Sequence, residues 1–216
     1  MSANQRGVTG ASVVSPGMRD RVRGIFTPIA LGLGRLGLTP NGLTMIGFIG
    51  TCVGAFAAAS QWWLAAGILV LVFGIFDMFD GTLARATGRA SKLGAFLDST
   101  FDRWGEGIVY VGIAAGCVAG GFPLGAVLSA AAMTSAFMVS YTRAKSESLG
   151  FTPGTGMANV GLAPREVRLA ILSIGLILTS VTGSTVLAST LGLIAILATL
   201  TTIQRVLHVR AQSREG

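Results

Sequence analysis

The residues of this sequence best suited to chemistry are four aspartates in two pairs: Asp77 and Asp80, then Asp98 and Asp102. Residues three or four positions apart lie on the same face of a helix, so each pair shares one helical face. Ala84 continues the face of the first pair, and Gly94 lies one turn before the second. The stretch between the pairs is short and polar, which predicts two antiparallel helices whose carboxylates converge.

Carboxylates that are packed together repel one another and are costly to remove from water, so a cation should hold them. The stretch lacks the histidine and glutamate ligands of a zinc site and the alternating oxygen ligands of a calcium loop. Ligation by aspartate oxygens favours a hard ion, Mg²⁺ or Mn²⁺, which leaves coordination positions for phosphate oxygens. Gly81 and Gly94 let a bulky ligand approach the backbone, and the Arg85 guanidinium suits a phosphate. The pattern therefore predicts a metal–diphosphate site.

The alternative is that these aspartates are surface acids, paired with the basic residues of the same region: Arg85, Arg89, Lys92 and Arg103. Exposed ion pairs need no glycine or alanine at fixed spacing. The four aspartates also border long apolar stretches, where an unpaired acid is costly. We therefore favour the metal site.

The segments that must position these aspartates are strongly apolar. Of 216 residues, 51% are hydrophobic and 12% are charged, and the mean hydropathy is +0.70, whereas a soluble domain usually carries about 25% charge. Six nearly uncharged stretches, with their less apolar ends, reach the ~20 residues that a membrane-spanning helix needs. They are Leu43–Ala59, Trp62–Phe76, Gly107–Phe122, Pro123–Thr142, Val167–Gly183 and Ser184–Gln204. We predict an all-α, polytopic membrane protein with six transmembrane helices.

The basic residues indicate how these helices are oriented. All sixteen Lys and Arg lie in the N-terminal segment, in residues 85–103 and 143–168, or from residue 205 onward. Six spans bring these regions to one side of the membrane, and positive residues favour the cytoplasm. We therefore expect cytoplasmic termini and a site on the cytoplasmic face of the plasma membrane. The net charge of +7 then indicates contact with anionic lipid headgroups rather than with nucleic acid.

We expect three segments along the chain. Residues 1–17 are predicted to be disordered and lack the apolar core of a signal peptide, residues 18–206 form the membrane domain, and residues 207–216 form a cytoplasmic tail. Arginines flank a nearly helical stripe of apolar residues at the start of the domain: Ile25, Phe26, Ile29, Leu33 and Leu36. This pattern predicts an amphipathic helix in the membrane interface, with a helix in solution as the alternative.

Two further features have simple interpretations. Cys52 and Cys117 fall inside predicted spans, where free thiols pack as small apolar groups, so no disulfide or metal site is expected. Gly112 and Gly116 form a GxxxG pair, which can let two helices approach closely. With 31 glycines in the chain, we interpret this pair as a chance occurrence.

The stretch D-M-F-D-G-T-L-A-R-x8-G-A-F-L-D-S-T-F-D, residues 77–102, resembles the signature of the CDP-alcohol phosphotransferases. The resemblance extends to the six-helix layout and the N-terminal amphipathic helix. It implies that Asp77, Asp80, Asp98 and Asp102 hold Mg²⁺ or Mn²⁺ against the diphosphate of CDP-diacylglycerol, and that Asp102 accepts the proton of the acceptor hydroxyl. It also implies nucleotide contacts from four positions: Gly81, Ala84, Arg85 and Gly94. A homodimer is implied as well.

The second basic region bears on the acceptor alcohol. Its candidate residues are Ser140, Arg143, Lys145, Arg165 and Arg168. Several cations suit a phosphorylated alcohol better than an uncharged one, although topology alone also accounts for positive residues here. The segments resemble the SY-x-[KR]-A-[KR] and VG-x-A-x-R-x-x-R-L stretches of actinobacterial phosphatidylinositol-phosphate synthases and related archaeal enzymes. That resemblance implies that these five residues bind inositol phosphate.

The match departs from those enzymes at Pro164, where they commonly have an acid, and at Glu166–Val167, where they have Pro-Glu. Glycerol phosphate therefore stays open as the acceptor, which corresponds to a phosphatidylglycerophosphate or cardiolipin-type synthase. A cation-coupled transporter with intramembrane acids is a third hypothesis. We favour the enzyme because the acids gather at one end of the predicted helices and the sequence shows no repeated halves.

Overall fold

The computed structural model describes residues 16–151 and 160–214 of the 216-residue chain. Within these ranges the chain forms α-helices and no strand, which confirms the predicted all-α class. The helices are α1 (Pro16–Arg35), α2 (Pro40–Ala59), α3 (Trp63–Phe76), α4 (Met78–Ala86), α5 (Lys92–Ala119), α6 (Pro123–Ser148), α7 (Arg165–Thr182) and α8 (Ser184–Gln212). The predicted disorder of residues 1–17 lies almost wholly outside the described residues, and α1 already begins at Pro16.

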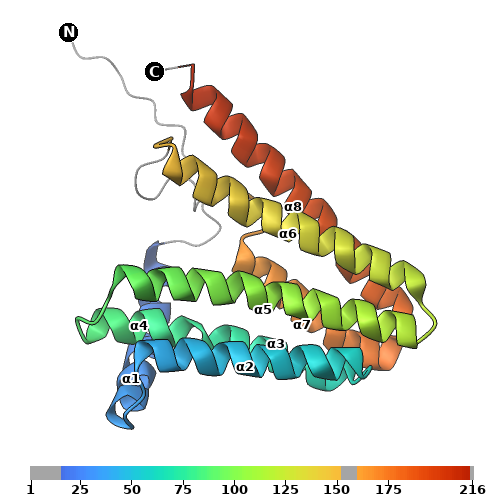
Figure 1. Cartoon of the computed structure of the whole chain (residues 1–216), viewed down its shortest axis with the longest axis horizontal. Coiled ribbons are helices and arrows are strands. Elements are labelled where there is room, and N and C mark those ends of the chain that lie inside the picture. The colour runs from blue at the N-terminus through green and yellow to red at the C-terminus, as the bar shows by residue number, and fades with distance from the viewer. Residues whose placement is uncertain (1–15, 152–159, 215–216) are drawn as a thin grey trace.

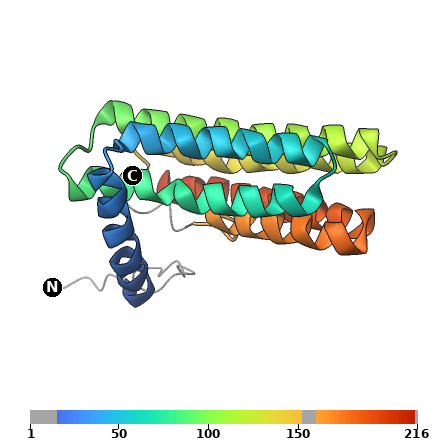
Figure 2. The same cartoon turned by 90° about the horizontal axis from the view of Figure 1, so that it is seen from below.

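Six of the helices form an elongated, closed ring, in which each packs against two neighbours: α2, α5, α6, α8, α7 and α3. The continuation of α3 is α4, after a turn at Asp77. The connections of α2 to α3, α5 to α6 and α7 to α8 lie at one end of the ring, and α1 lies across the other end (Figure 2). At that second end α6 and α8 diverge from α2 and α5 (Figure 1).

Short polar signals set the helix ends near the aspartates. The Thr39 hydroxyl accepts a hydrogen bond from the Gly42 N–H, and Pro40 occupies the first turn of α2. The Ser91 hydroxyl caps α5 in the same way through the Gly94 N–H. Hydroxyl caps satisfy amide groups that have no partner inside the helix, and proline fits the first turn. The antiparallel pair of α4 and α5 is thus defined by residues adjacent to the aspartates.

The apolar residues of α1 divide between two surroundings. Phe26, Ala30 and Leu33 pack against Phe79 and Leu83 of α4, and the Phe26 and Phe79 ring centroids are 5.1 Å apart. In contrast, Ile29 is 47% exposed, and Leu36, directly after the helix, is 80% exposed. One side of α1 therefore anchors the helix to the bundle, and apolar side chains remain on another side, as expected for a helix that also meets lipid.

Four helical segments are long and apolar enough to cross a membrane, rather than the six predicted: Pro40–Ala59, Trp63–Ala86, Pro123–Ser148 and Ser184–Gln212. The difference arises in α5 and α7. The 18 residues of α7 include Arg165, Glu166 and Arg168, and the first half of α5 carries acids and bases of the aspartate region. The charged residues of α5 and α7 therefore keep these two helices from qualifying as membrane spans by composition. Both nevertheless contribute to the apolar core, together with α2, α3, α6 and α8.

The GxxxG pair on α5 is a close helix contact, so our interpretation of it as a chance occurrence was wrong. A Cβ atom on Gly112 would lie 2.2 Å from the Ala55 carbonyl oxygen of α2, and one on Gly116 would lie 2.2 Å from that of Ala58. The α2 backbone cannot move aside for an added side chain in the way that a flexible side chain could. These glycines therefore set the distance between α2 and α5, the helices that carry Thr44 and two of the aspartates.

We expect Gly112→Val to destabilise the protein by about 1–3 kcal/mol because the added atoms overlap the α2 backbone. Thermal unfolding in detergent measures this effect. Gly192→Val on α8 is the matched control, since a Cβ there meets no atom within 4 Å. Equal shifts for both variants would contradict the close contact.

Candidate active site

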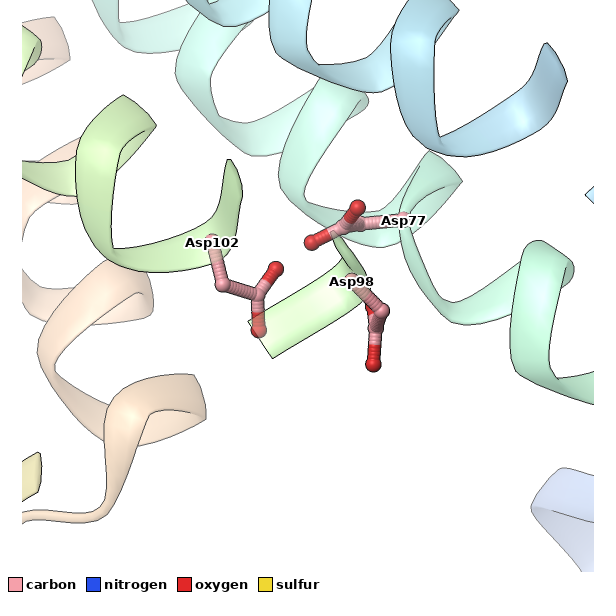
Figure 3. Close-up of side chains that lie close together, drawn as sticks. All are labelled: Asp77, Asp98 and Asp102. Carbon is pink, nitrogen blue, oxygen red and sulfur yellow. The ribbon is translucent and has the colours of Figure 1, made fainter. Parts of the chain in front are cut away.

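Three of the four aspartates point toward a common space (Figure 3). Asp77 comes from the turn between α3 and α4, while Asp98 and Asp102 come from successive turns of α5. One carboxylate oxygen from each lies within 4.8 Å of the other two. This spacing suits a divalent cation, and an all-oxygen ligand set favours Mg²⁺ or Mn²⁺. The residues therefore fit the metal that the sequence predicts.

Asp80 is held beside this group rather than in it. Its carboxylate accepts hydrogen bonds from the Thr44 hydroxyl and from the Gly81 N–H. It is buried, and it interacts electrostatically with Asp98 and Asp77. Thr44 was missed by sequence analysis because it lies 36 positions away on α2, with no spacing to link it to the aspartates. Asp80 thus has a fixed orientation next to the three-carboxylate group.

Arg165 enters the aspartate group from the first residue of α7. Its Nη1 atom lies 2.8 Å from Asp77 Oδ2 and 2.9 Å from Asp102 Oδ1. All three side chains are mostly buried, so these ion pairs are screened less than surface pairs. The structure therefore brings one predicted acceptor residue into direct contact with two predicted metal ligands.

The electrostatics of Asp98 show why a cation matters here. Asp98 lies in the second turn of α5, ahead of the apolar part of that helix. Burial raises the pKa of its carboxyl, and the Asp77 carboxylate raises that pKa further, while Arg165 and Arg103 oppose the change. Burial and like charge both disfavour the ionised form. A bound cation would favour that form.

A cavity of about 160 Å³ opens beside Asp80 and Asp98. It is lined by every position predicted to contact the nucleotide: Gly81, Ala84, Arg85 and Gly94. The remaining lining residues come from the start of α2, the α4–α5 connection and the start of α5, and include Asn41, Thr44, Arg89 and Ser91. A Cβ on Gly94 would lie 3.1 Å from Ser91 Oγ and 3.5 Å from Asn41 Oδ1, so glycine keeps this wall of the cavity open.

The other predicted acceptor residues are placed differently from Arg165. Arg168 is 1% exposed and makes two hydrogen bonds to the Glu106 carboxylate, at 2.9 and 2.8 Å. Arg143 is exposed and pairs with Glu147 on its own helix, at 2.8 Å. Lys145 is also exposed, and the Ser140 hydroxyl bonds to the Ala136 carbonyl, at 3.4 Å. Of the five, the described contacts join only Arg165 to the aspartates.

Glu106 is a second residue that sequence analysis missed. It is buried on α5, pairs with Arg168, and lies 3.4 Å from Arg103. Glu106 lies four residues after Asp102, at the edge of an apolar stretch, and an acid in such a position could have been identified from the sequence as a candidate functional residue. The structure shows that this acid needs a partner from α7, 62 positions away.

Comparison with known proteins gives the class to which this fold and site belong. Residues 37–206 match the CDP-alcohol phosphatidyltransferase family, and the chain belongs to that family. It is therefore an enzyme of the CDP-alcohol phosphatidyltransferase class.

Individual relatives narrow the comparison. The chain is 35% identical over 202 residues to the archaetidylinositol phosphate synthase of Pyrococcus horikoshii, covering 92% of this chain and 98% of the relative. It is 36% identical over 200 residues to the phosphatidylinositol phosphate synthase of Streptomyces avermitilis, and the match covers 89% of this chain and 80% of that relative.

Two crystal structures of the phosphatidylinositol phosphate synthase of Mycobacterium tuberculosis share the fold. The structure with CDP-DAG bound gives a TM-score of 0.74 at 30% identity and covers 86% of this chain and 93% of that one. The structure in complex with manganese and citrate gives a TM-score of 0.74 at 29% identity, and the match covers 86% of this chain and 88% of that one.

We expect Asp98→Asn to weaken Mn²⁺ binding by about tenfold or more, because a charged ligand is replaced by a neutral one. Electron paramagnetic resonance of free Mn²⁺ measures the affinity in the absence of substrates. Glu147→Gln, which removes an exposed acid on α6, should bind Mn²⁺ as the unaltered protein does. Unchanged affinity in Asp98→Asn would exclude Asp98 from the ligand set.

Proposed function

We propose that the protein transfers a phosphatidyl group from CDP-diacylglycerol to a phosphorylated alcohol, preferably inositol phosphate, and releases CMP. The observation that carries the proposal is the meeting of the carboxylates of Asp77, Asp98 and Asp102 with the Arg165 guanidinium. The carboxylates suit a metal-bound diphosphate, and the arginine suits a phosphorylated acceptor. The names of the relatives support the same reaction.

Mg²⁺ or Mn²⁺ would be held by Asp77, Asp98 and Asp102, with Asp80 adjacent. The manganese complex of the Mycobacterium tuberculosis enzyme supports the choice of a divalent metal. When bound, the metal neutralises charge on the diphosphate as CMP leaves. The cytidine diphosphate part of the lipid would occupy the cavity beside these aspartates. There the exposed Arg85 guanidinium is available to a phosphate, and Gly81 and Gly94 leave room for the nucleotide.

Asp102 is our candidate general base. In the transfer, the acceptor oxygen forms a bond to the lipid-side phosphorus, the bond from that phosphorus to the CMP oxygen breaks, and the hydroxyl proton moves to Asp102. Arg165 lies 2.9 Å from Asp102, so an acceptor whose phosphate binds this guanidinium would lie beside the carboxylate. A carboxylate is a weak base for an alcohol, so orientation must supply much of the rate.

Ser140, Arg143, Lys145 and Arg168 remain proposed acceptor residues beside Arg165. The exposed side chain of Lys145 can approach a bound anion, as can that of Arg143 if it leaves its exposed partner Glu147, whereas Arg168 would first have to leave the buried Glu106. Pro164 and Glu166–Val167 depart from the pattern of the inositol phosphate enzymes that the segment resembles. A phosphatidylglycerophosphate or cardiolipin-type synthase is therefore the second candidate function.

We propose that residues 18–206 form one membrane domain with six spans, with α5 and α7 crossing beside the four apolar helices. The support is that α5 and α7 pack within the same ring and that their charged residues gather at the end bearing the aspartates. The positive residues near that end are the support for our proposal that it lies, with the helix α1 and the tail at 207–216, on the cytoplasmic side of the plasma membrane. The resemblance to the family is the support for a homodimer.

The proposed function is tested by CMP release from CDP-diacylglycerol with a panel of acceptors: inositol phosphate, glycerol phosphate, inositol, glycerol and serine. We expect release only with a phosphorylated alcohol, and only with Mg²⁺ or Mn²⁺ present. Chelation by EDTA should abolish the reaction, and added metal should restore it. The absence of CMP with every phosphorylated alcohol would refute the proposal.

We expect Asp102→Asn to lower turnover by about a hundredfold or more, because a general base is lost. Binding of CDP-diacylglycerol should persist, since the cavity is lined by other residues. Equilibrium binding of the lipid and the rate of CMP release measure the two effects separately. Unchanged turnover would remove Asp102 as the base.

A further inference from the structure

The connection that leads into α7 is attached to α8 by one buried hydroxyl. Thr201 of α8 is 0% exposed, and its Oγ1 atom accepts hydrogen bonds from the N–H groups of Leu162 and Ala163, at 3.1 and 3.0 Å. The same hydroxyl donates to the Leu197 carbonyl, at 2.8 Å. A hydroxyl has one donor and two acceptor positions. Thr201 uses all three, which fixes two successive amides of the connection.

Two neighbouring contacts hold the same segment. A Cβ on Gly161, which has φ of +119°, would lie 2.2 Å from the Thr201 methyl, so the backbone passes directly over this side chain. The buried Arg205 guanidinium, one turn further along α8, donates to the Val160 carbonyl, at 3.0 Å, and to the Val139 carbonyl of α6. Residues 160–163 therefore depend on α8 for their position.

That position matters because the first turn of α7 has no side-chain cap of its own. Instead, the Ala163 carbonyl accepts a hydrogen bond from Arg168 Nη1, at 2.9 Å, and Arg168 is paired with Glu106 of α5. The start of α7 is thus held between α8 on one side and α5 on the other. Arg165, whose guanidinium reaches Asp77 and Asp102, lies two residues after Ala163.

We propose that Thr201 is a positioning residue for the acceptor side of the site: its hydroxyl fixes residues 160–164 so that Arg165 reaches the aspartate group. This inference rests on the proposed function, because Arg165 is assigned to the acceptor there. Thr201 itself touches no substrate. Its effect is transmitted through the Leu162 and Ala163 amides to the first residue of α7.

The test compares Thr201→Val, which has a similar shape but no acceptor oxygen, with Thr201→Ser, which keeps the hydroxyl. Valine removes the acceptor of the Leu162 N–H and of the buried Ala163 N–H, so we expect the KM for inositol phosphate to rise about tenfold. The KM for CDP-diacylglycerol should stay unchanged. Arg165→Gln, which should also raise the KM for inositol phosphate, serves as the reference for a lost acceptor contact. Thr201→Ser should restore the KM of the unaltered enzyme.

Thr202→Val is the matched control on the same helix, because the Thr202 hydroxyl bonds to the Ala198 carbonyl of its own helix. It should leave both KM values unchanged. An unchanged acceptor KM in Thr201→Val, or equal increases for both substrates, would overturn the proposal. Should Thr201→Val fold poorly, Thr201→Ala and Thr201→Ser form the same comparison.

Hydrogen exchange separates this proposal from the proposed function. The amides of peptides covering residues 160–168 should exchange faster in Thr201→Val than in the unaltered protein or Thr202→Val, in full-length protein without substrate. Unchanged exchange would overturn the anchoring role. Faster exchange in a protein that releases no CMP with any acceptor would retain the anchor and reject the proposed function.

Discussion

The site depends on placing four carboxylates at the end of an apolar helix bundle. Carboxylates in such surroundings repel one another and lose their hydration, so each must find a donor or an opposite charge. Thr44 and the Gly81 N–H satisfy Asp80, and Arg165 pairs with Asp77 and Asp102. Gly47 brings α2 close to Asp77, since a Cβ there would lie 3.4 Å from its carboxylate. The helices α2, α5 and α7 thus all supply groups to this end of the bundle.

Charge is compensated at two levels of the bundle. At the first level, Asp77 and Asp102 pair with Arg165. At the second level, Arg168 pairs with Glu106, and both of these side chains are buried. The pair gains a further hydrogen bond from Arg168 to the Ala163 carbonyl. A buried ion pair is tolerated when its geometry is good and its remaining hydrogen-bonding groups are satisfied. These ion pairs allow α5 and α7 to pack within the ring of helices. By composition alone, the charged residues of α5 and α7 keep the two helices from qualifying as membrane spans.

Local spacing explains what the sequence could predict. Asp77 and Asp80, like Asp98 and Asp102, are close along the chain, so helical periodicity alone brings each pair onto one face. The partner of Arg168 could not be predicted, because Glu106 is 62 positions away and the contact depends on how α5 and α7 are rotated in the ring. The apolar residues of α1 were predicted to share one face of the helix. In the structure Phe26 packs against α4 while Ile29 stays exposed, because α4 covers only one side of α1.

The two halves of the site are built in different ways. The aspartates and the nucleotide cavity come mainly from one continuous stretch, α3 to α5, with the start of α2 as a wall. The side that we propose for the acceptor involves α6, α7 and α8, whose contacts cross long sequence separations, as between Thr201 and Ala163. A change in the second half can therefore reshape acceptor binding without moving the metal ligands. The aspartate motif by itself therefore leaves the acceptor open.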